Sequence, residues 1–204
     1  MPRAGLKSNI LDSLNSTSNE CVVKIESICY NRFVSRYNFN TEVGMLAIWD
    51  SKSLSFVNNK ATYEANFVKD SAMVKLMEEG KIVVWGTGGD GSFLVDVRID
   101  QEKELSAEEE KIVVSSLKNY KLIVTSGNVL VGTPEYAGSV ENEGLSAGAV
   151  TKVEGLEEGK YIVNVYFLYS NESTDDDKTG YVVALHKASD DQIFCVSTSF
   201  PQLG

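Results

Sequence analysis

The sequence Glu-Glu-Gly-Lys occurs twice in this chain, at residues 78–81 and again at residues 157–160, each time next to apolar residues. Each copy is followed by a run rich in β-branched and aromatic residues, 82–85 in the first case and 161–165 in the second. Runs of this composition are typical of β-strands. Because an internal repeat constrains a fold more than a local pattern does, the pair predicts a duplicated, β-rich architecture.

The similarity between the two copies continues beyond the strands that follow them. Residues 82–85 and 93–99 are predicted to form an antiparallel hairpin around a glycine-rich turn, and residues 161–169 and 181–185 to form its counterpart. The offset between matched positions changes along the chain, which places insertions in loops, where they are tolerated best.

The expected fold is mainly β, with duplicated β-sandwich-like halves and a few short helices. The predicted organisation is an N-terminal lead-in and strand over residues 1–42, a first β-rich repeat over 43–120 and a second over 121–204. Short helices are predicted at residues 71–79, where apolar side chains share one face, and at 106–111, where Ser-Ala-Glu-Glu resembles a capping box.

Composition limits the classes of protein to which the chain can belong. Its 204 residues, 43% of them hydrophobic, can bury one ample core or two small ones. No run approaches the roughly 18 apolar residues of a membrane-spanning helix, and no apolar signal core follows Met1. We therefore expect a cytoplasmic protein without a membrane partner. Cys21, Cys29 and Cys195 are an odd number without metal-ligand spacing, which predicts reduced, buried thiols.

The formal net charge of −10 disfavours nucleic acid as a partner, because neutralising phosphates needs clustered Lys and Arg. Two interpretations of the acidity stay open. It serves solubility, or it steers the chain towards a basic protein partner such as a nuclease.

Residues 86–91, Gly-Thr-Gly-Gly-Asp-Gly, fit the letters of a dinucleotide-binding loop. That loop requires a following helix whose N-terminus faces the pyrophosphate. Residues 93–99 alternate like a strand instead, so a glycine turn is predicted and no cofactor is expected. A cation or anion site in the turn is the alternative. Trp85 beside the turn and Asp90 within it are candidate interaction residues, although a tryptophan in such a position commonly fills a core.

The run Asp175, Asp176 and Asp177 lies where the second predicted hairpin is longer than the first. It lacks the alternating spacing of a calcium loop, so the alternatives are a solvated loop extension and a contact for a partner. His186 is the single histidine and has no nucleophile motif to serve. No catalytic residue and no metal ligand are predicted.

Two stretches resemble known protein families. Residues 85–93, Trp-Gly-Thr-Gly-Gly-Asp-Gly-Ser-Phe, look like a hairpin found in bacterial β-rich families of unknown function. Residues 156–166 are similar to a Gly-x-Tyr-x-Val-x-Val strand signature in small β proteins of the same kind. Some of those families resemble toxin-immunity proteins, so the resemblance implies a protein that binds and neutralises another protein.

The sequence thus predicts a non-enzymatic binding protein, of immunity or inhibitor type, for a basic protein partner. One alternative is a small-ligand or carbohydrate-binding β-sandwich module that uses exposed aromatic residues. Another is an enzyme whose carboxylates, for example Asp90 and Asp96, converge only in the folded chain.

Overall fold

The computed structural model describes residues 34–170, 180–196 and 199–204. All of these belong to one compact unit, Asn31–Gly204. Cys21 and Cys29, as well as the predicted interaction residues Asp175, Asp176 and Asp177, lie outside the described residues.

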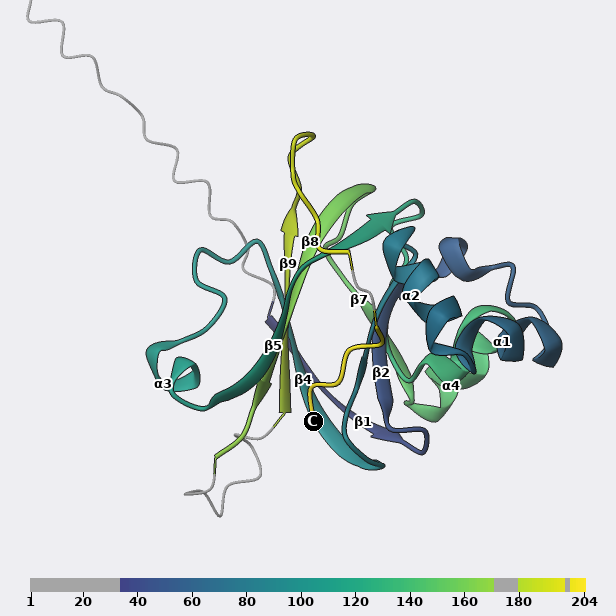
Figure 1. The fold of residues 1–204 in the computed structure, drawn as a ribbon, viewed down its shortest axis with the longest axis horizontal. Helices are drawn as coiled ribbons and strands as arrows, with labels where there is room; N and C mark the ends of the chain where they lie inside the picture. The colour runs from purple at the N-terminus through teal and green to yellow at the C-terminus, as the bar shows by residue number, and fades with distance from the viewer. Residues whose placement is uncertain (1–33, 171–179, 197–198) are drawn as a thin grey trace, which may run out of the picture. The chain divides into compact units, whose positions relative to one another are not determined.

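The described residues form two β-sheets that face each other (Figure 1). The five-stranded sheet has the strand order β1 (Val34–Thr41), β4 (Gly91–Ile99), β9 (Gly180–Lys187), β8 (Gly159–Leu168) and β5 (Val113–Val124). The four-stranded sheet has the order β3 (Ile82–Gly86), β2 (Met45–Asp50), β6 (Val129–Gly132) and β7 (Val150–Val153). The expected mainly β, sandwich-like fold with short helices is confirmed.

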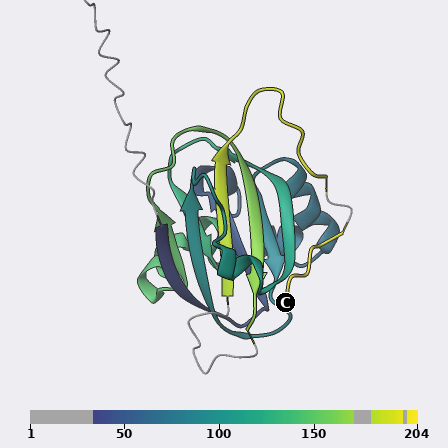
Figure 2. The same ribbon diagram turned by 90° about the vertical axis from the view of Figure 1, so that its left-hand side faces the viewer.

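Short helices lie on the outer sides of the two sheets. The four-stranded sheet carries α1 (Lys60–Phe67), α2 (Asp70–Glu78) and α4 (Glu141–Ala147) on its outer side (Figure 1). The 3₁₀ turns are η1 (Ser51–Leu54), η2 (Pro134–Tyr136) and η3 (Gly138–Val140). Across the outer side of the five-stranded sheet lies α3 (Ala107–Glu110) (Figure 2). Its predicted capping box is confirmed, because Ser106 and Glu109 each accept from the other's backbone N–H.

The four-stranded sheet is apolar on both faces because helices cover the face that does not meet the other sheet. Every residue of β3 and β6 is buried, and so are the last five residues of β2. Trp49 of β2 has no exposed surface, and its indole N–H donates to Glu141 of α4 at 3.1 Å. Strands covered on both sides read as continuous apolar runs, as these do.

The five-stranded sheet has one apolar and one polar face. Along β4, Val95 and Val97 belong to the central core, whereas Asp96 and Arg98 alternate with them and make ion pairs. This period-two pattern is the one expected for a sheet that packs on one side only.

One of the two predicted hairpins is confirmed and the other is wrong. Strands β8 and β9 pair in antiparallel register from Tyr161 opposite Lys187 to Leu168 opposite Gly180. In contrast, β3 and β4 lie in different sheets: β3 pairs with β2, and β4 pairs with β1 and β9. The glycine-rich stretch between them is a corner that carries the chain from one sheet to the other.

The two Glu-Glu-Gly-Lys segments occupy different structural positions. The first begins at the last residue of α2 and has Gly80 at φ +74°, whereas the second leads into β8 with Gly159 at φ +152°. The two predicted repeats each supply strands to both sheets, and their boundaries at residues 42 and 120 stay a prediction.

Among the described residues, no helix combines the length and apolar character needed to cross a membrane.

Candidate functional site

Three chain segments meet at one end of the sandwich, and each brings a carboxylate. Glu42 lies in the turn between β1 and β2, Asp90 in the corner between β3 and β4, and Glu135 in η2. The Thr87 amide donates to the Gly44 carbonyl at 2.8 Å, which fixes the corner against the turn. We call Glu42, Asp90 and Glu135 the acidic end.

Glu42 and Asp90 are close enough to Glu135 to influence its ionisation. Burial raises the pKa of Glu135, and the negative charges of Glu42 and Asp90 raise it further. Glu135 in turn acts on Tyr63 of α1, where burial first and this charge second raise the pKa to about 12. Within the described part of the chain, no salt bridge reaches Glu42, Asp90 or Glu135. The acidic end is therefore a concentration of negative charge that forms no ion pair with residues 34–170, 180–196 or 199–204.

Of the residues that the sequence singled out, the structure places Asp90 on the surface and Trp85 in the core. Asp90 is exposed. Trp85 has no exposed surface and packs against Tyr181, with ring centroids 5.7 Å apart. The prediction of Trp85 as an interaction residue is wrong, because β3 is covered on both faces and its side chain cannot reach a partner.

The cysteine prediction needs one correction. Cys195 is a free thiol, as expected, but it is exposed and not buried. It follows β9 in a segment that runs past β5, where its amide donates to the Asn119 carbonyl at 2.7 Å.

A second polar cluster lies on the outer face of the five-stranded sheet, around Glu104. One carboxylate oxygen of Glu104 lies 2.7 Å from both Asn164 Nδ2 and His186 Nε2, and the other accepts from the Tyr166 hydroxyl. Asn164 and Tyr166 project from β8 and His186 from β9, so three strand residues converge on one loop residue. The cluster fixes the loop before α3 onto the sheet.

The charge state of Glu104 makes it a poor general base at neutral pH. Burial raises the pKa of Glu104, but hydrogen bonds from His186, Tyr166 and Asn164 outweigh it and hold the pKa at about 2. The hydrogen bond to Glu104 raises the pKa of His186. A general base works best with a pKa near the working pH, which Glu104 does not have.

The Asp96 carboxylate belongs to an ion-pair network beside this cluster. Arg36 of β1 donates to it at 2.7 Å, and Arg98 approaches it at 3.4 Å while also binding Glu109 of α3 at 2.5 Å. Asp90 precedes β4 and Asp96 lies well inside it, so a rise of roughly 3.3 Å per residue separates them by ~15–20 Å. The two acids do not converge, which removes the basis for the predicted pair of catalytic carboxylates.

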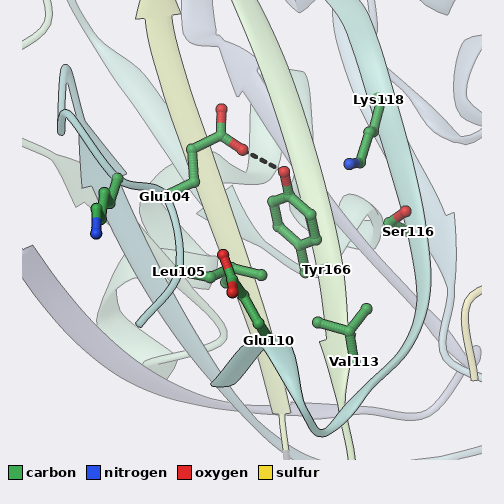
Figure 3. Close-up of a pocket in the computed structure, with 8 residues that line it drawn as sticks. Glu104, Leu105, Glu110, Val113, Ser116, Lys118 and Tyr166 are labelled. Carbon is green, nitrogen blue, oxygen red and sulfur yellow. Dashed lines mark hydrogen bonds between the residues drawn. The ribbon is translucent and has the colours of Figure 1, made fainter. Parts of the chain in front are cut away.

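An open pocket of about 450 Å³ lies between α3, its preceding loop and strands β5 and β8 (Figure 3). Its lining includes Lys103, Glu104, Leu105, Glu110, Val113, Ser116, Lys118 and Tyr166. The Lys118 ammonium lies 5.3 Å from the centre of the Tyr166 ring. Tyr166 is 7% exposed, so it presents no flat aromatic face of the kind that stacks on sugars.

Comparison with known proteins identifies no family. No protein-family model matches the sequence, and no curated protein matches it. Similar solved structures include one described as crocagin biosynthetic gene J, with a TM-score of 0.49 and 14% identity over 78% of this chain and 99% of that one. They also include ComJ from Bacillus subtilis, described as an inhibitor of the DNA-degrading activity of NucA, with a TM-score of 0.47 and 8% identity over 77% of this chain and 97% of that one.

The sequence pointed to only one member of the acidic end. Asp90 stood out because it interrupts a glycine run, whereas Glu42 and Glu135 lie in ordinary polar turns far away along the chain. Their proximity depends on the corner between the sheets, and no local pattern predicts that corner. The Glu104 cluster was missed for the same reason, since its members are separated by 60 residues or more from Glu104.

Proposed function

We propose that this chain is a non-enzymatic binding protein of inhibitor or immunity type, and that its partner is a basic protein that contacts the acidic end. The observation that carries the proposal is the gathering of Glu42, Asp90 and Glu135 without a cation from the described part of the chain. Like charges held together disfavour the folded chain, so the arrangement gains most when a positively charged surface approaches it.

The charge of the whole chain supports the same partner. A net charge of −10 attracts a basic protein over long distances and raises the rate of encounter. Lysine and arginine side chains on the partner would then form ion pairs with the carboxylates at closest approach.

The described residues on either side of the predicted interaction residues Asp175, Asp176 and Asp177 belong to the end of the five-stranded sheet at which β4 begins. Leu168 of β8 pairs with Gly180 of β9, and Gly180 pairs with Leu94 of β4, close to Asp90. The segment between β8 and β9 therefore starts and ends at the sheet end that carries Asp90. We propose that its three aspartates add to the attraction of the acidic end.

The test is the association rate with a basic nuclease, which is the first class of partner to try because ComJ is described as inhibiting a nuclease. The variant combines Glu42→Gln, Asp90→Asn and Glu135→Gln. Removing three charges at the contact should slow association by about tenfold or more at low salt and weaken its dependence on ionic strength.

A matched control removes the same charges elsewhere. Glu78, Glu158 and Asp190 are exposed, and they lie near the opposite ends of the strands, at the end of α2, before β8 and after β9. Changing them to Gln, Gln and Asn should reduce the association rate far less. Equal losses in both variants would show that only net charge matters, and unchanged rates in both would refute the proposed contact.

The pocket beside Tyr166 supports a second candidate function, the binding of a small charged ligand. Its volume of about 450 Å³ lies in the usual range for such sites, and it offers ammonium and carboxylate groups together. A nuclear magnetic resonance screen of small zwitterions tests it, with Lys118→Met as the variant that should abolish binding. The cytoplasmic location expected from the sequence stays a prediction.

A further inference from the structure

Residues 201–203 lie along the free edge of β3, where Gln202 forms an isolated bridge with Gly86. The Gly86 amide donates to the Pro201 carbonyl at 2.9 Å, and the Leu203 amide donates to the Gly86 carbonyl at 3.0 Å. These two bonds make a parallel bridge between Gly86 and Gln202. Because β3 pairs with β2 on its other side, the segment takes the place of the next strand in the four-stranded sheet.

The same segment also contacts the five-stranded sheet and the core between the sheets. Leu203 is 4% exposed and belongs to the central core, and Pro201 is buried. The Ser115 hydroxyl of β5 donates to the Leu203 carbonyl at 2.5 Å. The segment therefore bridges the edges β3 and β5, one from each sheet, and Figure 1 shows it in yellow passing between them.

The close approach requires a glycine at position 88, because a Cβ atom there would lie 2.5 Å from the Gly204 backbone. A Cβ atom on Gly86 would meet only the end of the exposed Gln202 side chain, which can move aside. Gly88 also has φ +78°, which side chains rarely adopt. The glycine-rich run, whose sequence matched a dinucleotide-binding loop, thus forms part of the surface on which residues 201–204 lie in extended conformation. We call this surface, formed by Gly86, Gly88 and Ser115, the seat.

We propose that this seat is a peptide-acceptor site that binds an extended Pro-x-Leu-Gly segment in trans, and that residues 201–204 are the ligand already bound to it in cis. Edge-strand pairing supplies affinity through main-chain bonds, while a side-chain pocket supplies specificity. Both parts are present, in the two bonds of Gly86 and in the buried Leu203. The seat shares the β3–β4 corner with Asp90 but uses none of the carboxylates of the acidic end, so the proposal does not depend on the proposed function.

The cis segment competes with any ligand in trans. A tethered segment acts at an effective concentration of about millimolar, so wild-type chain should bind a free peptide only at far higher concentration. Weakening the cis segment at Leu203 should open the seat without altering Gly86, Gly88 or Ser115.

The experiment uses the full chain with Leu203→Ala and a synthetic peptide, Ser-Phe-Pro-Gln-Leu-Gly, that reproduces residues 199–204. We expect saturable binding that moves the amide resonances of Gly86 and Gly88 and raises the melting temperature of the variant. The apparent affinity should be at least tenfold higher than for the wild-type chain.

A peptide with Asp in place of Leu is the matched control, and it should not bind, because a carboxylate cannot enter the apolar site of Leu203. The proposal is overturned if the original peptide does not bind to saturation, if Gly86 and Gly88 do not respond, or if the Asp peptide binds equally well. Should Leu203→Ala fail to fold, Leu203→Val removes less of the buried side chain and serves for the same measurements.

Discussion

In the four-stranded sheet nearly every residue of β2, β3 and β6 is buried and apolar, whereas the buried end of β4 in the five-stranded sheet alternates valines with the charged residues Asp96 and Arg98. The first sheet is covered by helices as well as by the other sheet, so its stability comes from apolar packing. On the outer face of the second, the described part of the chain places α3 and its loop, which polar contacts of Glu104 and Arg98 hold in place. Substitutions in the two sheets should therefore differ in size and in their dependence on pH.

The largest effect should come from the sheet that is covered on both sides. Trp49→Ala removes a fully buried indole and its hydrogen bond to Glu141. We expect the free energy of unfolding to fall by about 3–5 kcal/mol, measured by urea denaturation. The control is Val114→Ala in β5, where the side chain is 61% exposed and the loss should stay below about 0.5 kcal/mol. Equal losses would contradict the contrast between the two sheets.

A smaller and pH-dependent effect should come from the polar face. The folded pKa of Glu104 is about 2 against an ordinary 4.5, so its stabilisation is complete above pH 4.5 and is lost as the pH falls towards 2. Glu104→Gln should cost about 2 kcal/mol at pH 7, a figure reduced for the partial exposure of the side chain.

The difference between wild type and Glu104→Gln should vanish near pH 2, as measured by thermal unfolding at several pH values. Trp49→Ala is the control, since its loss should vary little over the same range. A loss from Glu104→Gln that is constant with pH would show that the lost shape, and not the lost charge, destabilises the variant.

The smallest effect should come from the acidic end, and its sign should be reversed. The pKa of Glu135 is raised, so the folded chain favours the protonated form and loses stability as the pH rises through the folded pKa. Glu135→Gln should therefore stabilise the chain at pH 7 by a few tenths of a kcal/mol, seen as a slightly higher melting temperature. A lower melting temperature would mean that this carboxylate has a structural role.

Local patterns predicted the elements of the fold better than their arrangement. The capping box at Ser106 and the strands around Gly86–Gly91 could be predicted because caps and period-two alternation are properties of a few neighbouring residues. The sheet to which a strand belongs depends on partners far along the chain, so the hairpin expected across the glycine run was wrong. The repeated Glu-Glu-Gly-Lys segment suggested two equivalent hairpins, but the strands that follow it belong to different sheets. An apolar strand sequence suits β3, in a sheet buried on two faces, as well as β8, in a sheet buried mainly on one.

The candidate site was harder to predict from the sequence than the fold was. The glycine run around Asp90 marked it as a candidate. Glu42 and Glu135 lie near it only because the β3–β4 corner contacts the β1–β2 turn, which no local sequence pattern predicts. Trp85 was misassigned because its chemical character suits a binding surface as well as a core. The burial of β3 on both faces is what places Trp85 in the core and not on a binding surface.

The position of β9 has a consequence for the time course of folding. It is the last strand in the chain order, yet it lies at the centre of the five-stranded sheet, between β4 and β8. During synthesis, β1 with β4 and β5 with β8 can form only as separate ribbons, while all strands of the four-stranded sheet have already left the ribosome. The parallel pairing of Leu94 with Gly180 closes a long loop and should be slow. Until β9 arrives, β4 and β8 each present an unpaired edge, and a nascent chain is then most exposed to pairing with its neighbours.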